Sequence, residues 1–376
     1  MRLVSFLGTN DYTEVTYALP EKDQTCASRY VQEALVSHYD ITEVVILVTP
    51  EARDMHADAV GEVLRPYGVP LEFNSIANPV DEPSQWALFE ALAEAVGDAR
   101  KAVLDVTHSF RSVPLIGVAA ALYLEKLHGL TVEPIVYGHF DKATSTGTVV
   151  ELGSFLSLIK LTYGADIFER TGDARPLQRQ LSRHPDNDTS PVLHNLGHMS
   201  DALHLLQGPA LARSAKHLHQ SVSFYRPTTP RTTAEHALVR HVDEAFAPFR
   251  NSGPLQVQLE QVRYYTDRRA WSAALIAVVE LIVTCVCHAA NLQTRAKANR
   301  KRARVMLNPK KCSAEDFPAN QRLRDHYSTL NDYRNRVSHN AQGRSIKGDV
   351  QALSRQIETA LKDFLEDAPT LLKDYL

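Results

Sequence analysis

The run NDYRNRVSHN, residues 331–340, combines residue types that could act together on a phosphodiester. Histidine titrates near neutral pH and suits proton transfer, and an arginine guanidinium offers two parallel donors to phosphate oxygens. Cleaving RNA without a metal requires proton transfer at the ribose 2′-hydroxyl and at the leaving oxygen, with positive charge beside the phosphorus. Arg334 and His339 fit these roles, and Asn335 could orient a water or the phosphate. The simpler alternative is a solvated helix end.

The spacing of this Arg–His pair limits how it could work. Two residues five positions apart on a regular helix lie about 140° apart around its axis. We therefore expect the pair to lie near a helix end, or to be completed by side chains from a second copy of the chain. Because such a pair also occurs by chance, the rest of the sequence has to decide between the two interpretations.

Two groups of polar residues follow predicted strands. They are Gly8, Thr9 and Asn10 after the first strand, and Thr107, His108, Ser109 and Arg111 after a later one. In open α/β sheets, ligands bind beyond the carboxyl ends of the strands, and hydroxyl and backbone N–H groups at a helix N-terminus favour phosphate. Arg111 would add a forked pair of donors. The alternative is a strand-to-helix turn in which Asp, Thr and Ser only cap the helix.

Several other classes of site are disfavoured by the sequence. It contains neither G-x-G-x-x-G nor G-x-x-x-x-G-K-[ST], which counts against a dinucleotide-dependent dehydrogenase and a P-loop ATPase. His194 and His198 have the i, i+4 spacing of a metal pair, but no zincin-type Glu lies between them, so we predict no metal site. The four cysteines have no Cys-x-x-Cys pairing and predict neither a zinc ribbon nor a disulfide framework.

The composition is that of a globular protein with an uneven charge distribution. The 376 residues predict two domains, and the formal net charge is -3. Residues 293–312 nevertheless contain eight Lys or Arg and no acid, so they form either a surface for RNA phosphates or a solvated loop. The apolar run 271–290 includes Glu280 and His288 and predicts a core helix. With no signal-peptide pattern, we expect a reduced, cytoplasmic protein without a membrane span.

The fold class is predicted from alternating strand and helix patterns. Strands are expected at residues 2–8, 43–49, 71–76, 101–107 and 131–138, and helices at 29–39, 56–68, 84–98 and 113–129. This alternation predicts a doubly wound parallel sheet, a Rossmann-like α/β domain over residues 1–155.

The remainder of the chain reads as mainly α-helical. A polar break is expected at 175–192 and a Pro- and Thr-rich loop at 223–236, whereas 254–288 predicts a pair of helices. We expect a helical connecting region over 156–255 and a helical catalytic domain over 256–376.

Together, FLGTN, DVTHSFRSVP and YRNRVSHN resemble the CRISPR-associated Rossmann-fold (CARF) plus HEPN proteins, the accessory ribonucleases of type III CRISPR systems. The resemblance covers nearly the whole chain, although residues from about 155 to 250 contain no matching motif. The combination is more specific than any one of its elements.

The resemblance implies a role for each motif. Gly8, Thr9 and Asn10 match the first-strand loop of a sensor for cyclic oligoadenylate, and Thr107, His108, Ser109 and Arg111 match its later ligand loop. Many relatives have Gly in place of Ser109, which leaves the loop geometry and ring size open. Arg334, Asn335 and His339 match the HEPN pattern of Arg, a polar residue, and His four to six positions on.

It also implies partners and a mechanism. The protein would form a homodimer or higher homo-oligomer whose two Arg–His pairs converge on one composite site. Cyclic oligoadenylate, with a ring of four favoured over a ring of six, would be an allosteric activator, and no cofactor is expected. Single-stranded RNA would be cut by 2′-hydroxyl attack without a metal, leaving a 2′,3′-cyclic phosphate.

Three alternatives remain at this stage. The protein could be a ligand-responsive regulator without nuclease activity. It could also degrade its own cyclic ligand through Thr107, His108 or Ser109. A HEPN toxin paired with a nucleotidyltransferase antitoxin would explain only the helical half.

Overall fold

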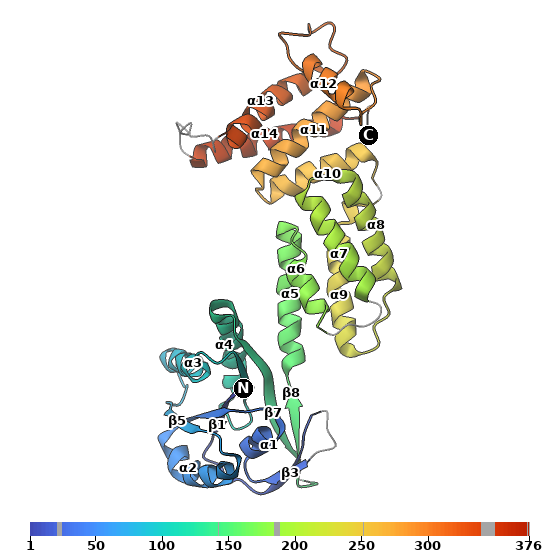
Figure 1. Cartoon of the computed structure of the whole chain (residues 1–376). Coiled ribbons are helices and arrows are strands. Elements are labelled where there is room, and N and C mark those ends of the chain that lie inside the picture. The colour runs from blue at the N-terminus through green and yellow to red at the C-terminus, as the bar shows by residue number, and fades with distance from the viewer. Residues whose placement is uncertain are drawn as a thin grey trace. The chain divides into compact units, whose positions relative to one another are not determined.

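A computed structural model describes residues 1–20, 25–141, 143–183, 189–250, 252–339, 350–373 and 375. The chain forms two compact units, Met1–Ser157 and Leu158–Leu376. The sequence analysis ended the first domain at residue 155. Helix α5 (Gly153–Thr171) follows strand β8 directly and carries the chain from one unit to the next (Figure 1).

The first unit alternates strands and helices. Its strands are β1 (Arg2–Leu7), β2 (Val15–Ala18), β3 (Thr25–Ser28), β4 (Glu43–Val48), β5 (Leu71–Ser75), β6 (Lys101–Asp105), β7 (Thr131–Asp141) and β8 (Thr146–Glu151). Its helices are α1 (Val31–His38), α2 (Pro50–Leu64), the 3-10 turn η1 (Arg65–Tyr67), α3 (Glu82–Val96) and α4 (Val113–His128). The five strands and four helices expected from the sequence are all present.

One eight-stranded sheet in the order β3-β2-β8-β7-β6-β1-β4-β5 forms the centre of this unit. Its central strands are buried on both sides, as their continuous apolar runs predict. In β1, Leu3 and Leu7 face a hydrophobic cluster beneath α1 and α2, whereas Val4 and Phe6 face a second cluster beneath α3 and α4. The doubly wound arrangement is therefore confirmed.

The sheet is mixed rather than wholly parallel. Strands β7, β6, β1, β4 and β5 are parallel, but β8 is antiparallel to β7 and β3 is antiparallel to β2. The sequence analysis assigned no element to β2, β3 or β8. Strands β2 and β3 have only four residues each and lie at one edge of the sheet, where short strands give a weak sequence signal.

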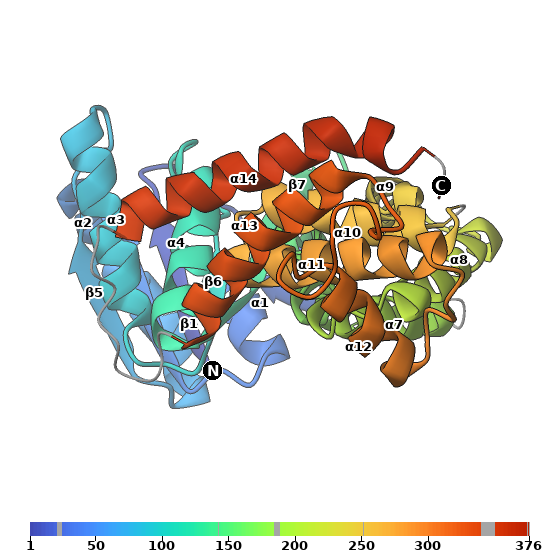
Figure 2. The same ribbon diagram turned by 90° about the horizontal axis from the view of Figure 1, so that it is seen from above.

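The second unit contains helices, turns and loops and no strand among its described residues. Its helices after α5 are α6 (Arg175–Leu181), α7 (Thr189–His204), α8 (Gly208–Phe224), α9 (Pro230–Ala245), the 3-10 turn η2 (Ala247–Phe249), α10 (Pro254–Asp267), α11 (Trp271–Ala289), α12 (Lys297–Met306), α13 (Gln321–His339) and α14 (Val350–Leu371). Figures 1 and 2 show α13 and α14 side by side, and the two helices are in contact.

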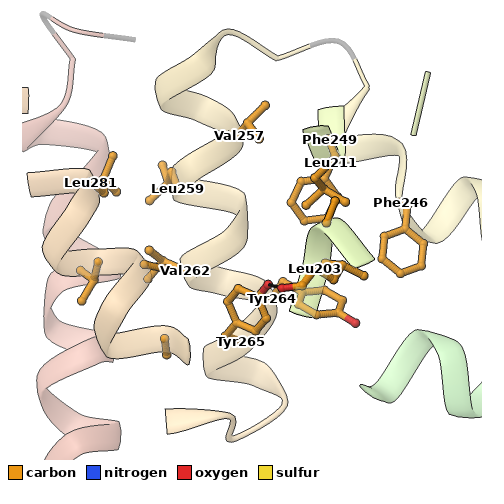
Figure 3. Close-up of a cluster of buried hydrophobic side chains, with 14 of the residues drawn as sticks. Leu203, Leu211, Phe246, Phe249, Val257, Leu259, Val262, Tyr264, Tyr265 and Leu281 are labelled. Atoms are coloured by element: carbon orange, nitrogen blue, oxygen red, sulfur yellow. Dashed lines mark hydrogen bonds between the residues drawn. The ribbon is translucent and has the colours of Figure 1, made fainter. Parts of the chain in front are cut away.

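One hydrophobic cluster extends through this unit from Leu161 to Leu372, so helices on both sides of residue 255 share a core. Figure 3 shows part of the cluster, in which α10 packs against α8 and the chain near η2. The hydroxyl of Tyr265 donates a hydrogen bond to the carbonyl oxygen of Leu203, which satisfies the polar tip of a buried ring. The division into a connecting region and a catalytic domain stays a prediction.

Two expected irregular segments are helical instead. Within the predicted break at 175–192, α6 forms because Leu177 and Leu181 are buried in the core, and α7 begins at Thr189; residues 184–188 lie outside the described part. Within the predicted loop at 223–236, α9 starts at Pro230. There Thr229 and Thr232 form a reciprocal capping box, which turns a Pro- and Thr-rich stretch into a helix start.

Helix α11 is a core helix, as predicted. Among the described residues, it is the one helix that is long and apolar enough to cross a membrane. However, 61% of its apolar window is buried inside the helical unit. Its acidic residue, Glu280, forms ion pairs with Arg300 and Arg304 of α12. Those pairs explain how a carboxylate is accommodated in so apolar a helix.

Candidate functional site

The sheet order places the carboxyl end of β1 at a special point of the sheet. Strand β1 lies between β4 and β6 and is parallel to both. After β1 the chain forms β2 and β3 at the far edge of the sheet, returns through α1 to β4 and β5 on one side of β1, and then crosses to β6 on the other. The helices α1 and α2 cover one face of the sheet and α3 and α4 the other, so the end of β1 next to β6 is a topological switch point, the place where open α/β sheets commonly bind ligands.

The two predicted ligand loops meet at this point. The position of a Cβ atom on Gly8 would lie 3.5 Å from the carbonyl oxygen of His108. The ring centroids of Tyr12 and His108 are 4.2 Å apart. The structure thus brings the loop after β1, which contains Thr9 and Asn10, beside the loop after β6.

An aromatic cluster that the sequence analysis did not assign lies under these loops. The ring of Tyr12 lies between His108 and His56 of α2, with its centroid 4.6 Å from that of His56. Tyr30 packs edge-on against Tyr12, and its hydroxyl lies 3.3 Å from Nδ1 of His56. The Tyr12 hydroxyl accepts a hydrogen bond from Gly8 N (2.8 Å) and donates one to Gly8 O (3.2 Å). Tyr12 therefore fixes the course of the loop after β1.

No spacing in the sequence links these residues. Tyr12 follows β1, Tyr30 precedes α1 and His56 lies within α2. These residues come together only when the separate elements pack in the folded unit. The available signal was weak: Tyr12 follows the predicted loop directly, and His56 is the one histidine of a helix that begins just after a buried strand.

Both histidines of this cluster have a buried ring nitrogen. His56 is 7% exposed, and Nε2 of both His56 and His108 is buried without a hydrogen-bond partner among the described residues. Burial lowers the pKa of His108, while Asp105 raises it and His56 lowers it further. Burial also raises the pKa of Tyr12 to about 12, so its hydroxyl remains a donor.

A buried carboxylate supports the loop after β6 from below. Asp105 is fully buried at the end of β6 and accepts hydrogen bonds from Ser5 Oγ (2.5 Å) and from the backbone N and hydroxyl of Thr107. Gln32 Nε2 in turn donates to Ser5 Oγ (2.9 Å). Hydrogen bonding of this kind is what allows a carboxylate to be buried.

The predicted ligand residues divide into supporting and exposed groups. The hydroxyl of Thr107 also accepts from Gly138 N (2.8 Å), and Ser109 Oγ donates to Val106 O (2.7 Å), so both hydroxyls hold the loop itself. Thr9, Asn10 and Arg111 have exposed side chains at the same edge. These three are the ones that remain available to a ligand.

The start of α4 offers fewer donors than the sequence analysis expected. Val113 N already donates to Phe110 O (2.9 Å), and Pro114 has no N–H group. A helix N-terminus binds phosphate through its unpaired N–H groups. Any phosphate bound here would rely on Arg111 and the loop more than on the helix end.

The predicted nuclease residues lie in the final turns of α13. Arg334 and Asn335 are half-buried, and Arg334 Nη2 donates to Asn335 Oδ1 (2.7 Å). This contact fixes the guanidinium beside the amide. The backbone of α13 continues to His339, whose side chain lies outside the described part. A helix regular to that point separates Arg334 and His339 by about 140° around its axis.

Charged groups from neighbouring helices converge near Arg334. Burial raises the pKa of Tyr327, which lies about two turns before Arg334 in α13. The positive charges of Arg304 and Arg334 lower it, and the negative charge of Glu280 raises it. Tyr327 is therefore influenced by the charges of Glu280 in α11, Arg304 in α12 and Arg334 in α13.

The i, i+4 pair His194 and His198 lies within α7. The rings of His194 and His198 pack edge to face, with centroids 4.3 Å apart. Within the described ranges, no group of three or more His, Cys, Asp or Glu side chains is arranged to hold a metal ion.

This architecture defines a class of protein: a doubly wound α/β unit with two polar loops meeting at its switch point, joined to a helical unit with an Arg-Asn pair near a helix end. No family model matches the sequence. The chain is similar to CRISPR-associated protein MJ1674 of Methanocaldococcus jannaschii, with 22% identity over 358 residues, covering 92% of this chain and 51% of the relative. The chain thus spans about half the length of that relative. The CRISPR-associated resemblance is confirmed by this match.

A solved structure aligns along the full chain at low similarity. It is Csm6 of Enterococcus italicus bound to cyclic hexa-2'-fluoro-hexa-dAMP, with a TM-score of 0.46 and 12% identity over 100% of this chain and 95% of that one. This likeness is too distant to assign a ligand or an activity to the present chain.

Proposed function

We propose that the protein is an endoribonuclease of type III CRISPR defence that cuts single-stranded RNA without a metal when cyclic oligoadenylate binds its α/β unit. One observation carries the proposal. The two loops expected to bind the ligand are far apart in sequence, yet they meet at the switch point, with 3.5 Å between the Cβ position of Gly8 and His108 O. The similarity of the chain to a CRISPR-associated protein supports the CRISPR part of the proposal.

The chemistry of these two loops suits a ring of phosphates and bases. Arg111 supplies a guanidinium for a phosphate, and Thr9 and Asn10 supply hydroxyl and amide groups at the exposed edge. The pseudo-symmetric ring would be shared by the α/β units of two chains. A ring of four adenylates is our first expectation, and a ring of six is its direct competitor in the test below.

The cleavage step is proposed to occur in a composite site of two chains. His339 takes the proton of the ribose 2′-hydroxyl, the 2′-oxygen attacks the phosphorus, and the bond to the 5′-oxygen breaks. The leaving oxygen takes a proton from the partner's His339. Arg334, held by Asn335, stabilises the charge on the phosphate oxygens. The products are a 2′,3′-cyclic phosphate and a 5′-hydroxyl.

Activation follows from linkage. The ligand can favour the active arrangement of the dimer only by binding it more tightly than the inactive one. The supporting hydrogen bonds of Thr107 and Ser109 disfavour the alternative in which these hydroxyls cleave the ring, because each is already engaged with the backbone.

The test is cleavage of a labelled single-stranded RNA in EDTA, with no ligand, cyclic tetra-adenylate or cyclic hexa-adenylate. We expect ligand-dependent cutting that is lost in both Arg334→Ala and His339→Ala proteins. Arg336→Ala is the matched control, because Arg336 is an exposed arginine of the same helix turn. Cutting that persists in His339→Ala protein would refute the nuclease assignment. Ligand binding without any cutting would favour the regulator alternative.

A further inference from the structure

We propose that α12 carries a binding surface for the phosphate backbone of single-stranded RNA, which leads the strand toward Arg334. The surface consists of Lys297, Lys301 and Arg302, and we call it the α12 surface. The inference rests on the proposed nuclease function and identifies the substrate contact that such a nuclease requires. The sequence analysis left this basic run open between an RNA surface and a solvated loop.

The loop alternative is excluded for five of the eight cations in the run, because Lys297–Met306 is a helix. Ala303 and Leu307 are buried in the core, which directs the opposite face outward. The three members of the α12 surface are all exposed. Lys297 and Lys301 lie one turn apart in a row, and Arg302 extends the surface around the helix, so the helix holds the three cations at fixed relative positions.

Two further arginines of α12 attach this helix to α11, but they do so differently. Arg300 is largely buried and contacts the Glu280 carboxylate, Glu280 O (3.2 Å) and Thr284 Oγ1 (3.1 Å), so its donors are engaged within the protein. Arg304 contacts only the Glu280 carboxylate among the described residues, and its side chain is 39% exposed. It therefore keeps donors facing solvent.

The position of Arg304 connects the α12 surface to the predicted nuclease pair. Both α12 and α13 pack against α11, and Arg324 of α13 donates a hydrogen bond to Met306 O at the end of α12 (3.0 Å). The charges of Arg304 and Arg334 both lower the pKa of Tyr327, which agrees with this packing. An RNA strand lying along α12 would pass from exposed lysines to an anchored arginine and then to Arg334. The sequence around α12 is also strongly basic. Residues 293–312 contain eight cations and no acid, although the whole chain has a net charge of -3.

RNA is the occupant that this arrangement favours. A row of exposed cations gains affinity for a polyphosphate by releasing its condensed counterions, which makes binding sensitive to salt. The row leads to a group suited to phosphodiester cleavage rather than to an apolar face, which a protein or membrane partner would require.

The experiment measures the affinity of the full-length protein for a fluorescein-labelled single-stranded RNA by anisotropy between 50 and about 300 mM NaCl. The RNA has 2′-O-methyl groups throughout, so it cannot be cut, and no cyclic ligand is added. The variant is Lys297→Gln/Lys301→Gln/Arg302→Gln, which leaves the contacts of Glu280 intact. The matched control is Arg179→Gln/Arg213→Gln/Lys216→Gln, which removes three exposed cations from α6 and α8.

We expect the variant to bind RNA roughly tenfold or more weakly at low salt. The slope of log K against log salt should fall by about 2, at about 0.7 for each lost phosphate contact on a single strand. The control should change little. An equal loss in both proteins, or an unchanged slope in the α12 variant, would overturn the proposal.

The binding assay separates this inference from the proposed function. If α12 carries RNA binding but no condition yields cleavage, the surface stands and the nuclease assignment fails. If the wild-type protein cuts RNA while the α12 variant binds and cuts it normally, the nuclease stands and this surface is wrong.

Discussion

At the scale of single residues, the best-defined feature is the buried Asp105 at the end of β6. It is fully buried, and it joins Ser5 of β1 to Thr107 of the ligand loop. This one side chain therefore links the two strands that border the switch point. Its hydrogen bonds explain why the polar end of an apolar strand can lie inside the sheet.

Asp105→Asn should destabilise the α/β unit by about 1–3 kcal/mol, because an amide has one acceptor oxygen where three donors approach the carboxylate. Urea denaturation followed by circular dichroism measures the change. Asp98→Asn is the control, since Asp98 is exposed in the same unit. Equal stability of the two variants would show that the buried network contributes nothing.

His108 should make the protein sensitive to acid. Its folded pKa is lowered by burial, so below about pH 6.5 the unfolded chain binds a proton that the folded chain resists. Stability from the neutral imidazole is therefore present above about pH 6.5 and is lost as the pH falls toward the folded pKa. The loss is at most about 1.4 kcal/mol per pH unit for one proton.

His108→Asn should flatten this acid limb of the stability curve. The measurement is the urea midpoint between pH 7.5 and 5. The exposed His128 provides the control substitution, His128→Asn, which should leave the limb as steep as in the wild-type protein. An acid limb unchanged by His108→Asn would contradict the assignment of a buried neutral imidazole.

At the scale of elements, the loop after β1 depends on a side chain from within itself. Tyr12 reaches back to both backbone groups of Gly8 and fills the space between His56 and His108. It thereby holds the loop against α2 and the loop after β6. The ligand residues Thr9 and Asn10 are exposed because Tyr12 holds the interior position.

Tyr12→Phe keeps the ring but removes both hydrogen bonds to Gly8. We expect the affinity for cyclic tetra-adenylate to fall about 3- to 10-fold, which corresponds to one typical net hydrogen bond. Isothermal titration calorimetry measures the affinity, and Tyr123→Phe, at an exposed tyrosine of α4, is the control. An unchanged affinity would mean that the loop does not need this anchor.

The attachment of α12 to α11 gives a second prediction at this scale. Glu280→Gln removes the charge that holds Arg300 and Arg304. RNA affinity should rise about two- to threefold, because one negative charge is lost near the strand. If Arg304 positions RNA, turnover of the activated enzyme should nevertheless fall. A rise in both affinity and turnover would show that Glu280 acts only through its charge.

At the scale of the whole molecule, the chain has separate cores. Two hydrophobic clusters flank the sheet, and another extends through the helical unit. Each unit can therefore respond to a substitution or a ligand by itself. This separation suits a protein in which ligand binding and cleavage occupy different units.

Phe246→Ala should lower the stability of the helical unit by about 3–5 kcal/mol, because the ring is 1% exposed and packs against Phe168 (5.0 Å between centroids). Calorimetry should show that only the unfolding transition of the helical unit moves to lower temperature. Cyclic tetra-adenylate at 100 times its dissociation constant should raise only the free energy of unfolding of the α/β unit, by about 2.7 kcal/mol. One transition that moves as a unit in both experiments would contradict independent cores.

Much of the fold could be read from the sequence because its signals are local. Continuous apolar runs mark β1 and β4, and helical spacing marks α4, α10 and α11. The motifs also marked the loops after β1 and β6, which lie side by side because polar residues directly after buried strands share one edge of a parallel sheet. That these loops bind a ligand stays a prediction. The helices α6 and α9 were missed because short segments with Pro and Thr also favour loops, and burial in the core decided between the two.

What the sequence determined by itself was the order of strands and helices, the two candidate loops and the Arg334–His339 motif. Only the tertiary structure decided that Tyr12 would lie between His56 and His108, that Asp105 would join Ser5 to Thr107, and that Glu280 would hold α12 against α11. Apart from the contact between Asp105 and Thr107, these contacts join residues 24 to 100 positions apart. No local pattern encodes them, because they exist only once the burial of apolar surface has fixed how the elements pack.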